Sequence, residues 1–225
     1  QPLRDAGLDR LNVSLDTLDK HGFQALVKGG TLEGVLSGLD AATRAGFTRT
    51  RVNAVLVRDV SELDRLELAE YCWSKGVTPR FIEMMPIGNL GYQSEGDMLT
   101  SSDLVAGIQK RHRLALEQTT GALSGPAKYW VVQSGVFKGK RLGTISPMSD
   151  NHFCGTCNRA RLTVSGGFRG CLGSDNEVQL LQDIRNGSKK ACLEHVHRAL
   201  SMKLPSHLMS EPGFVPLSAM IGIGG

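Results

Sequence analysis

Apolar positions in residues 10–85 follow two alternating periods. Continuous, β-branched-rich runs at 10–15, 48–57 and 78–85 are typical of buried strands. Between these runs, apolar residues recur every three or four positions over 32–45 and 62–75, which is the spacing of one helical face. The order strand, helix, strand, helix, strand predicts right-handed βαβ units built on a parallel sheet.

Capping residues mark the ends of the two longer predicted helices. Thr31 can cap the first helix, and Ser61 with Asp64 forms the pattern of a capping box at the start of the second. Gly46 and Gly76 follow the helix ends, where glycine is common. The buried face of the second helix is predicted to consist of Leu63, Leu66, Ala69, Cys72 and Trp73.

The carboxyl ends of parallel strands are where ligands bind in α/β proteins. In this sequence the predicted carboxyl ends are Ser14-Leu15-Asp16, Val57-Arg58-Asp59 and Met84-Met85-Pro86, which are therefore candidate ligand-binding segments. Three strands are too few for a closed barrel, and one βα unit takes roughly thirty residues. If the fold is barrel-like, several further units must therefore precede residue 1.

The pattern changes after Asn89. A helix over 103–112 is predicted with Ser102 as its cap, followed by short strands at 114–117, 129–133 and 142–145. Two more helices are expected near 177–185 and 189–203. We predict two domains: residues 1–95 contain the parallel βαβ units, and residues 96–225 form an α+β domain.

Composition limits the cellular compartments and the classes of ligand that suit this chain. The chain has 225 residues, is 40% hydrophobic and carries a formal net charge of +4, which only weakly favours an anionic ligand. No signal peptide pattern and no membrane-spanning apolar run occurs in the sequence. Five cysteines with no disulfide framework suit a reducing interior, so we expect a cytoplasmic protein with no membrane partner.

Three cysteines have the spacing of metal ligands. Cys154 and Cys157 form a C-x2-C pair, and thirteen residues separate Cys157 from Cys171. An iron–sulfur cube held by three thiolates leaves one iron open, whereas a structural zinc site would need a fourth ligand such as His152. The spacing alone leaves both open, and Cys72 and Cys192 lie at apolar helical positions that favour a core role.

Two arginines follow closely after the C-x2-C pair. Residues 159–164 alternate in character, so Arg159 and Arg161 would share one face of a strand. A turn at 165–167 would lead to a return strand that brings Cys171 back toward the pair. Two guanidinium groups beside a metal centre suit a polyphosphate, although an exposed strand could carry the same arginines without a ligand.

Several motifs together resemble one family. They are Leu11–Asp16, Arg80–Asn89, His152–Leu162, Glu211–Phe214 and the terminal Gly224–Gly225. These stretches are similar to those of the GTP 3′,8-cyclases, radical S-adenosylmethionine enzymes of molybdenum cofactor biosynthesis, and the resemblance covers essentially the whole chain. It implies an incomplete radical S-adenosylmethionine barrel followed by a domain with an auxiliary [4Fe-4S] cluster.

The resemblance also implies site residues. The auxiliary cluster would be held by Cys154, Cys157 and Cys171, with its open iron at the guanine. The GTP would be bound by Arg51, Arg80, Arg159 and Arg161, although the family commonly has lysine at the position of Arg51. Ser14 and Met85 match positions that line the S-adenosylmethionine site, and the Gly224–Gly225 tail is expected to reach into the active site.

One family motif is absent from the 225 residues. The family's radical-generating cluster uses a C-x3-C-x2-C motif, which this sequence lacks. We therefore expect that the second [4Fe-4S] cluster lies in an N-terminal part before residue 1 and that the chain is inactive alone. We also expect that the intact enzyme is a homodimer.

In the implied reaction, a 5′-deoxyadenosyl radical removes the ribose 3′ hydrogen of GTP, and the sugar carbon then attacks purine carbon 8.

Two alternatives stay open from the sequence. One is another radical S-adenosylmethionine enzyme with an auxiliary cluster, since the arginines alone do not define the substrate. The other is a non-enzymatic zinc-binding module that contacts nucleic acid. Three Tyr and two Trp offer little surface for base stacking, and βαβ units do not suit such a module, so we expect no nucleic-acid partner.

Overall fold

The computed structural model describes residues 2–87, 98–118 and 125–209. The chain forms two compact units. Residues 1–84 and 97–149 form the first, which we call the sheet unit, and residues 85–96 and 150–225 form the second, which we call the cysteine unit. Each unit is described by itself.

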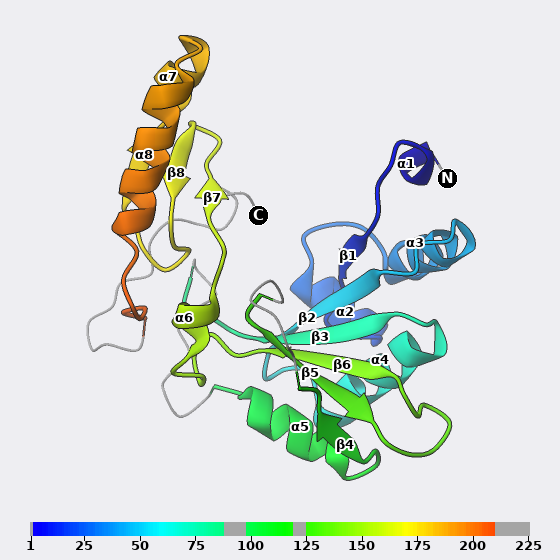
Figure 1. Ribbon diagram of the computed structural model, residues 1–225. Coiled ribbons are helices and arrows are strands. Elements are labelled where there is room, and N and C mark those ends of the chain that lie inside the picture. The colour runs from blue at the N-terminus through cyan, green and yellow to red at the C-terminus, as the bar shows by residue number, and fades with distance from the viewer. Residues whose placement is uncertain (1, 88–97, 119–124, 210–225) are drawn as a thin grey trace. The chain divides into compact units, whose positions relative to one another are not determined.

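The sheet unit is built on six strands in the order β1-β2-β3-β6-β5-β4 (Figure 1). Their bounds are β1 Leu11–Ser14, β2 Thr50–Leu56, β3 Thr78–Glu83, β4 Leu114–Leu116, β5 Ala127–Val132 and β6 Arg141–Ile145. Neighbours from β1 through β3 to β6 pair in parallel, whereas β5 and β4 pair antiparallel at the other edge. The predicted parallel βαβ arrangement is confirmed.

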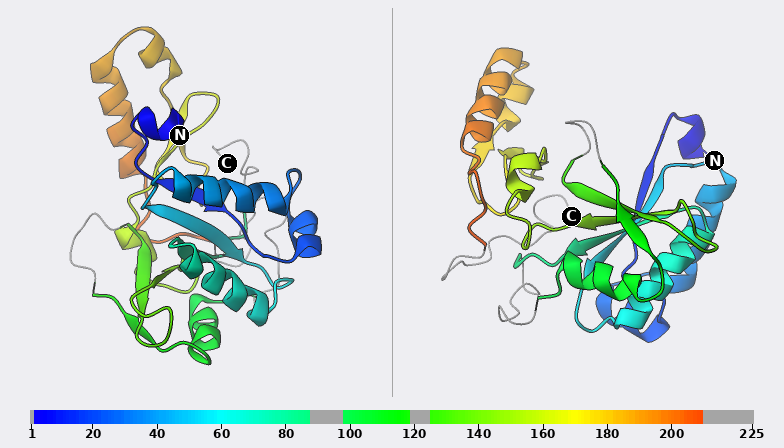
Figure 2. Two further views of the ribbon diagram at one scale, coloured as in Figure 1. Left: turned by 90° about the vertical axis from the view of Figure 1, so that its right-hand side faces the viewer. Right: turned by 60° about the horizontal axis from the view of Figure 1, so that its bottom comes forward.

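The described part of the sheet unit contains five helices. They are α1 Pro2–Asp5, α2 Lys20–Leu26, α3 Leu32–Arg44, α4 Glu62–Ser74 and α5 Ser101–Gln109. The capping box of Ser61 and Asp64 is present at α4, and the Thr31 side chain caps α3 by accepting from the Gly34 N–H. Helices α3 and α4 connect successive parallel strands and lie along the sheet (Figure 2).

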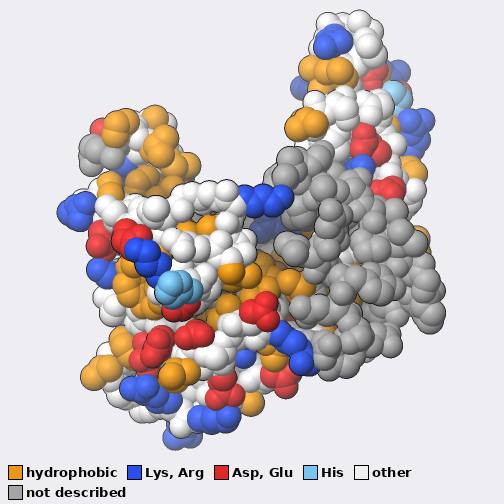
Figure 3. All heavy atoms as spheres, turned by 180° about the vertical axis from the view of Figure 1, so that it is seen from behind, with side chains coloured by type: hydrophobic (Ala, Val, Ile, Leu, Met, Phe, Trp, Pro, Cys, Tyr) orange, Lys and Arg blue, Asp and Glu red, His pale blue; other side chains and the backbone are white. Residues whose placement is uncertain are grey.

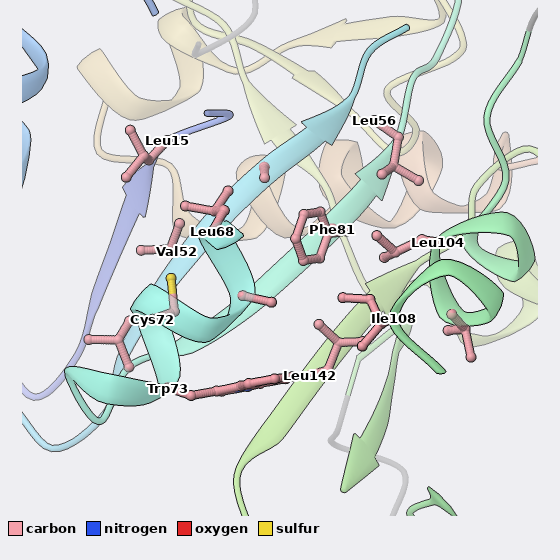
Figure 4. Packing of buried hydrophobic residues seen from close by; sticks show 14 of the residues in the cluster. Leu15, Val52, Leu56, Leu68, Cys72, Trp73, Phe81, Leu104, Ile108 and Leu142 are labelled. Atoms are coloured by element: carbon pink, nitrogen blue, oxygen red, sulfur yellow. The ribbon is translucent and has the colours of Figure 1, made fainter. Parts of the chain in front are cut away.

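The core lies on one face of this sheet. Val52 of β2 and Phe81 of β3 are fully buried and pack with Leu68 and Trp73 of α4 and with Ile108 of α5 (Figure 4). Each such side chain contributes roughly 1.5–3 kcal/mol by leaving water.

Trp73 also links a helix to a strand. Its Nε1 donates to the Arg141 carbonyl at 2.9 Å, which ties α4 to β6. The predicted face of α4 was wrong at one position, because Leu63 is 56% exposed and Leu68 is buried in the core instead.

The cysteine unit holds a second, three-stranded antiparallel sheet in the order β7-β8-β9. Its elements are α6 Phe153–Thr156, β7 Arg161–Leu162, β8 Gly167–Arg169, β9 Glu177–Gln179, α7 Leu181–Arg185 and α8 Lys189–Ser201. The predicted helix over 177–185 was wrong in its first part, since Glu177–Gln179 pairs with β8 as a strand.

Two further expectations differ from the structure. The cap of α5 is Thr100 in a capping box with Asp103, not Ser102. The predicted boundary at 95/96 is also not where the structure divides the chain, because β6 pairs with β3 and draws β4, β5 and α5 into the sheet unit. Strands β4, β5 and β6 are short, and their residue pattern does not indicate which other strand each one pairs with.

Candidate functional site

One face of the sheet opposite the core carries polar residues. Ser14 pairs with Asn53, and Asn53 pairs with Arg80, so the three lie in one row across β1, β2 and β3. Side chains in such a row project from the same face of a sheet, and so do residues two positions away along a strand. Arg51 and Asn12 therefore share this face. We call Asn12, Ser14, Arg51, Asn53 and Arg80 the polar face.

Arg80 is held tightly within the polar face. The side chain is only 7% exposed. Its Nε and Nη2 donate to Asn53 Oδ1 at 2.9 and 2.7 Å, and Nη2 also donates to Asn12 Oδ1 at 3.0 Å. The guanidinium is thus fixed by two amide side chains, Asn53 from the neighbouring strand β2 and Asn12 from β1 beyond it.

A glycine makes room for Arg80. Gly143 of β6 is the direct partner of Arg80, and a Cβ at that position would lie 2.7 Å from Arg80 Cγ and 3.1 Å from Tyr129 Cε1. No larger residue fits without displacing one of these side chains. Asn12, Asn53 and Gly143 were not predicted as site residues. The signal in the sequence was polar and small residues at alternating positions within otherwise apolar strands.

The loop after β1 is fastened by a carboxylate. Asp16 Oδ1 accepts from the Val55 N–H at 2.7 Å, which ties the end of β1 to β2. Burial raises the pKa of Asp16, and this backbone hydrogen bond partly opposes the rise. Asp16 thus positions the carboxyl end of the strand that carries Ser14.

A second buried carboxylate organises the end of β3. Glu83 is 1% exposed and accepts from the backbone N–H groups of Ser101, Met148 and Ser149 at 2.8, 3.1 and 2.9 Å. The Ser149 hydroxyl donates to it as well. One side chain therefore joins β3, the first turn of α5 and the segment after β6.

In the cysteine unit, the C-x2-C pair occupies one short helical turn. Cys154 lies within α6, and the Cys157 N–H donates to the Cys154 carbonyl at 3.2 Å. The Cys157 carbonyl in turn accepts from Lys203 Nζ at 2.6 Å. Lys203 follows α8, so the turn that bears two thiols is bonded to the C-terminal end of that helix.

The segment around Cys171 packs against the same end of α8. A Cβ at Gly170 would lie 2.8 Å from the Ala199 carbonyl oxygen, and a Cβ at Gly173 would lie 3.2 Å from the Met209 sulfur. Glycine at these positions lets the backbone beside Cys171 approach its neighbours closely. The last turn of α8 and the residues after it thus contact both cysteine segments.

The three cysteines have the chemistry of metal ligands. All three are free, half-buried thiols. Over residues 2–87, 98–118 and 125–209, no group of three or more His, Cys, Asp or Glu side chains is arranged to hold a metal ion. The donor set of three free thiols on two anchored segments fits a cluster, and the assignment of Cys154, Cys157 and Cys171 as its ligands stays a prediction.

The two arginines of the cysteine unit that were predicted to bind GTP, Arg159 and Arg161, differ in position. Only Arg161–Leu162 forms β7, so the predicted alternating strand over 159–164 was too long. Arg159 is exposed just before the strand, and Arg161 is half-buried opposite Arg169. Glu177 accepts from Arg169 Nε at 2.8 Å, which offsets the charge of Arg169 beside Arg161.

The remaining predicted site residues lie close to the limits of the described ranges or outside them. Met85 is half-buried just after β3, and its carbonyl accepts from the Ile87 N–H at 2.7 Å. Gly224, Gly225 and the Glu211–Phe214 motif lie outside the described residues. On the face shown in Figure 3, Lys and Arg side chains are interspersed with Asp and Glu.

Comparisons with known proteins identify the family. The family model of Molybdenum Cofactor Synthesis C matches residues 77–209, and that of the Radical SAM superfamily matches residues 1–72. A GTP 3′,8-cyclase of Pseudomonas entomophila (strain L48) is 37% identical over 227 residues, which is 100% of this chain and 67% of that protein. The chain belongs to the GTP 3′,8-cyclase family.

Further members show the same extent of similarity. A GTP 3′,8-cyclase of Corynebacterium glutamicum (strain R) is 38% identical over 228 residues, and GTP 3′,8-cyclase 1 of Pseudomonas aeruginosa is 38% identical over 227 residues. The chain spans 60% of the length of the first and 68% of the second. The Molybdenum Cofactor Synthesis C model begins at Val77, so it includes β3 with Arg80.

The length and hydropathy of the described helices bear on whether any of them could span a membrane. None of those in residues 2–87, 98–118 and 125–209 has the length and apolar character needed to cross a bilayer.

Proposed function

We propose that the chain is the C-terminal portion of a GTP 3′,8-cyclase, an enzyme that converts GTP to (8S)-3′,8-cyclo-7,8-dihydroguanosine 5′-triphosphate in molybdenum cofactor biosynthesis. The observation that carries this proposal is the 35–38% identity to GTP 3′,8-cyclases over essentially the whole chain. The proposal places the protein in the cytoplasm, acting as a homodimer.

In this proposal the arginines bind the phosphates of GTP. Arg51 and Arg80 offer two positive charges on one face of the sheet unit, and Asn12 and Asn53 fix the orientation of Arg80. Arg159 and Arg161 offer two more in the cysteine unit. Planar guanidinium groups suit phosphate oxygens because each presents a fork of donors.

The remaining predicted residues bind the cofactors. Cys154, Cys157 and Cys171 hold the auxiliary cluster, and Ser14 and Met85 line the S-adenosylmethionine site. When bound, the two clusters and S-adenosylmethionine supply the radical chemistry and an open iron for the guanine. The Gly224–Gly225 end contributes backbone without side chains to the active site.

Metal analysis after anaerobic purification tests the cluster. We expect about four irons per chain, as in a [4Fe-4S] cluster, with acid-labile sulfide. Cys171→Ser should lose most of this iron, whereas Cys192→Ser, on the half-buried face of α8, should keep it. Stoichiometric zinc in place of iron would contradict the proposal.

Nucleotide binding tests the arginines. Arg161→Ala should weaken GTP binding by about 1–3 kcal/mol, the size of a charge-assisted hydrogen bond. Arg185→Ala, at the exposed end of α7, is the matched control and should leave the affinity unchanged. Equal affinities of the two variants would return Arg161 to a purely structural role.

A further inference from the structure

Lys203 makes a contact that the cluster assignment does not explain. Its Nζ donates to the carbonyl of Cys157, the second cysteine of the C-x2-C pair, at 2.6 Å. The side chain is half-buried, so this hydrogen bond is shielded from water more than a surface contact would be. A hydrogen bond with a charged donor is stronger than a neutral one.

The turn that Lys203 contacts has little support of its own. Helix α6 has four residues and no side-chain cap, and its end is closed by the bond from the Cys157 N–H to the Cys154 carbonyl. A turn this short is marginal in isolation. The direction in which the two thiols point therefore depends on contacts from outside the turn.

The end of α8 contacts both cysteine segments. Lys203 follows the helix directly and bonds to the Cys157 carbonyl, and the Ala199 carbonyl of the last turn lies against Gly170, next to Cys171. The two contacts come from residues only four positions apart. The segment of the C-x2-C pair and the segment of Cys171 therefore both contact this short stretch.

We propose that Lys203 is a positioning residue of the three-cysteine site, which fixes the C-x2-C turn by bonding its charged ammonium group to the Cys157 carbonyl. A cluster held by three cysteines would carry negative charge, so an ammonium group bonded to one of its ligand residues would raise its reduction potential. The inference rests on the cluster assignment made above and adds a residue from outside the cysteine motif.

Four forms of the full chain test this role: the wild type, Lys203→Met, Lys203→Arg and Lys190→Met. Lys203→Met removes the charge and keeps the apolar length, whereas Lys203→Arg keeps a charged donor. Lys190→Met is the control because Lys190 lies in α8, near Lys203 in the sequence, with its side chain 89% exposed. After anaerobic reconstitution, iron release to a chelator and the midpoint potential of the cluster are measured.

We expect Lys203→Met to release iron about tenfold faster than the control, as the loss of one charge-assisted hydrogen bond predicts. Its midpoint potential should be more negative, and Lys203→Arg should restore most of both properties. Release rates and potentials equal to those of Lys190→Met would overturn the proposal.

The metal-free chains separate positioning from simple folding. We expect metal-free Lys203→Met to melt within a few degrees of the control, because the four-residue turn that Lys203 holds can open locally without unfolding the rest of the chain. A large loss of metal-free stability would assign Lys203 to the fold instead and overturn the proposal. A wild-type chain that takes up no iron would refute the cluster assignment itself, and this inference with it.

Discussion

The guanidinium of Arg80 donates two hydrogen bonds to a single atom, Asn53 Oδ1, from Nε at 2.9 Å and from Nη2 at 2.7 Å. These two residues face each other in the register of β2 and β3. An arginine that is 7% exposed can be retained in a sheet only if its donors are satisfied. Asn53 thus sets the orientation from which Arg80 could reach a phosphate.

Replacing Asn53 should affect both stability and binding. Asn53→Ala leaves buried donors of Arg80 without this acceptor, so we expect the free energy of unfolding to fall by about 2–3 kcal/mol. Urea unfolding followed by circular dichroism measures it, with Asn186→Ala at an exposed position as the control. Unfolding curves that coincide for the two variants would contradict the structural role of Asn53.

Asn53→Asp separates binding from stability. The new carboxylate keeps an acceptor for Arg80 and adds a negative charge on the polar face. We expect stability close to that of the wild type but weaker binding of GTP, because the added charge neutralises Arg80 and repels phosphate. Calorimetry with GTP measures this, and undiminished affinity would remove Arg80 from the GTP site.

The sequence predicted the sheet unit where periodicity is long. Strands β1 to β3 follow from continuous apolar runs, and helices α3 and α4 follow from apolar residues that recur every three or four positions. Once these strands are known to be parallel, the row of Ser14, Asn53 and Arg80 follows from their register. Strand β6 joins the same sheet only through a long-range pairing with β3. No local pattern encodes such a pairing, so the predicted domain boundary fell in the wrong place.

The site was predictable in its chemistry but not in its supports. Thiol spacing and the family motifs pointed to the cysteines and arginines. Contacts such as those of Lys203 with Cys157 and of Glu83 with Ser149 join residues 46 and 66 positions apart. A side chain's partner at that separation depends on the folded backbone, which is why these residues were missed.

Glu83 should be important for the stability of the sheet unit. Glu83→Ala removes one acceptor from several backbone donors in a buried place, so we expect a loss of about 3–5 kcal/mol. Thermal and urea unfolding measure the loss, and Glu67→Ala, on the exposed side of α4, is the control. A change below about 1 kcal/mol would show that water replaces the carboxylate without cost.

Two glycines in the cysteine unit form a matched pair for testing the site. A Cβ at Gly170 would lie 2.8 Å from the Ala199 carbonyl, whereas a Cβ at Gly155 would meet nothing within 4 Å. We expect Gly170→Ala to displace the Cys171 segment and lower the iron content of the reconstituted chain, and Gly155→Ala to keep it. Equal iron contents would show that the packing of Gly170 on α8 does not control the position of Cys171.

Cys72 should resist alkylation in the folded chain. Its thiol is 1% exposed, and burial raises its pKa to about 12, so almost no thiolate forms at pH 8. Mass spectrometry after iodoacetamide treatment of the metal-free chain should find Cys192 modified and Cys72 unmodified. In denaturant Cys72 should react as well, and rapid labelling of Cys72 without denaturant would show that the core opens readily.

Ionisation of Asp16 should lower the free energy of unfolding, so this residue should make the folded chain less stable as pH rises. Burial raises its pKa in the folded chain above the ordinary value of 3.8, so between these two values the folded state holds more protons than the unfolded state. Stability then falls as pH rises through that window and stays lower above it. Asp16→Asn keeps an oxygen to accept from Val55 but does not titrate.

We therefore expect the stability of Asp16→Asn relative to the wild type to increase from about pH 4 upward and to level off above the raised pKa. Urea unfolding at closely spaced pH values from 4 to 8 measures this difference, with Asp9→Asn at an exposed position as the control for removing a charge. A difference that stays constant or shrinks as pH rises would show that the hydrogen bond from Val55 outweighs the burial of the carboxylate.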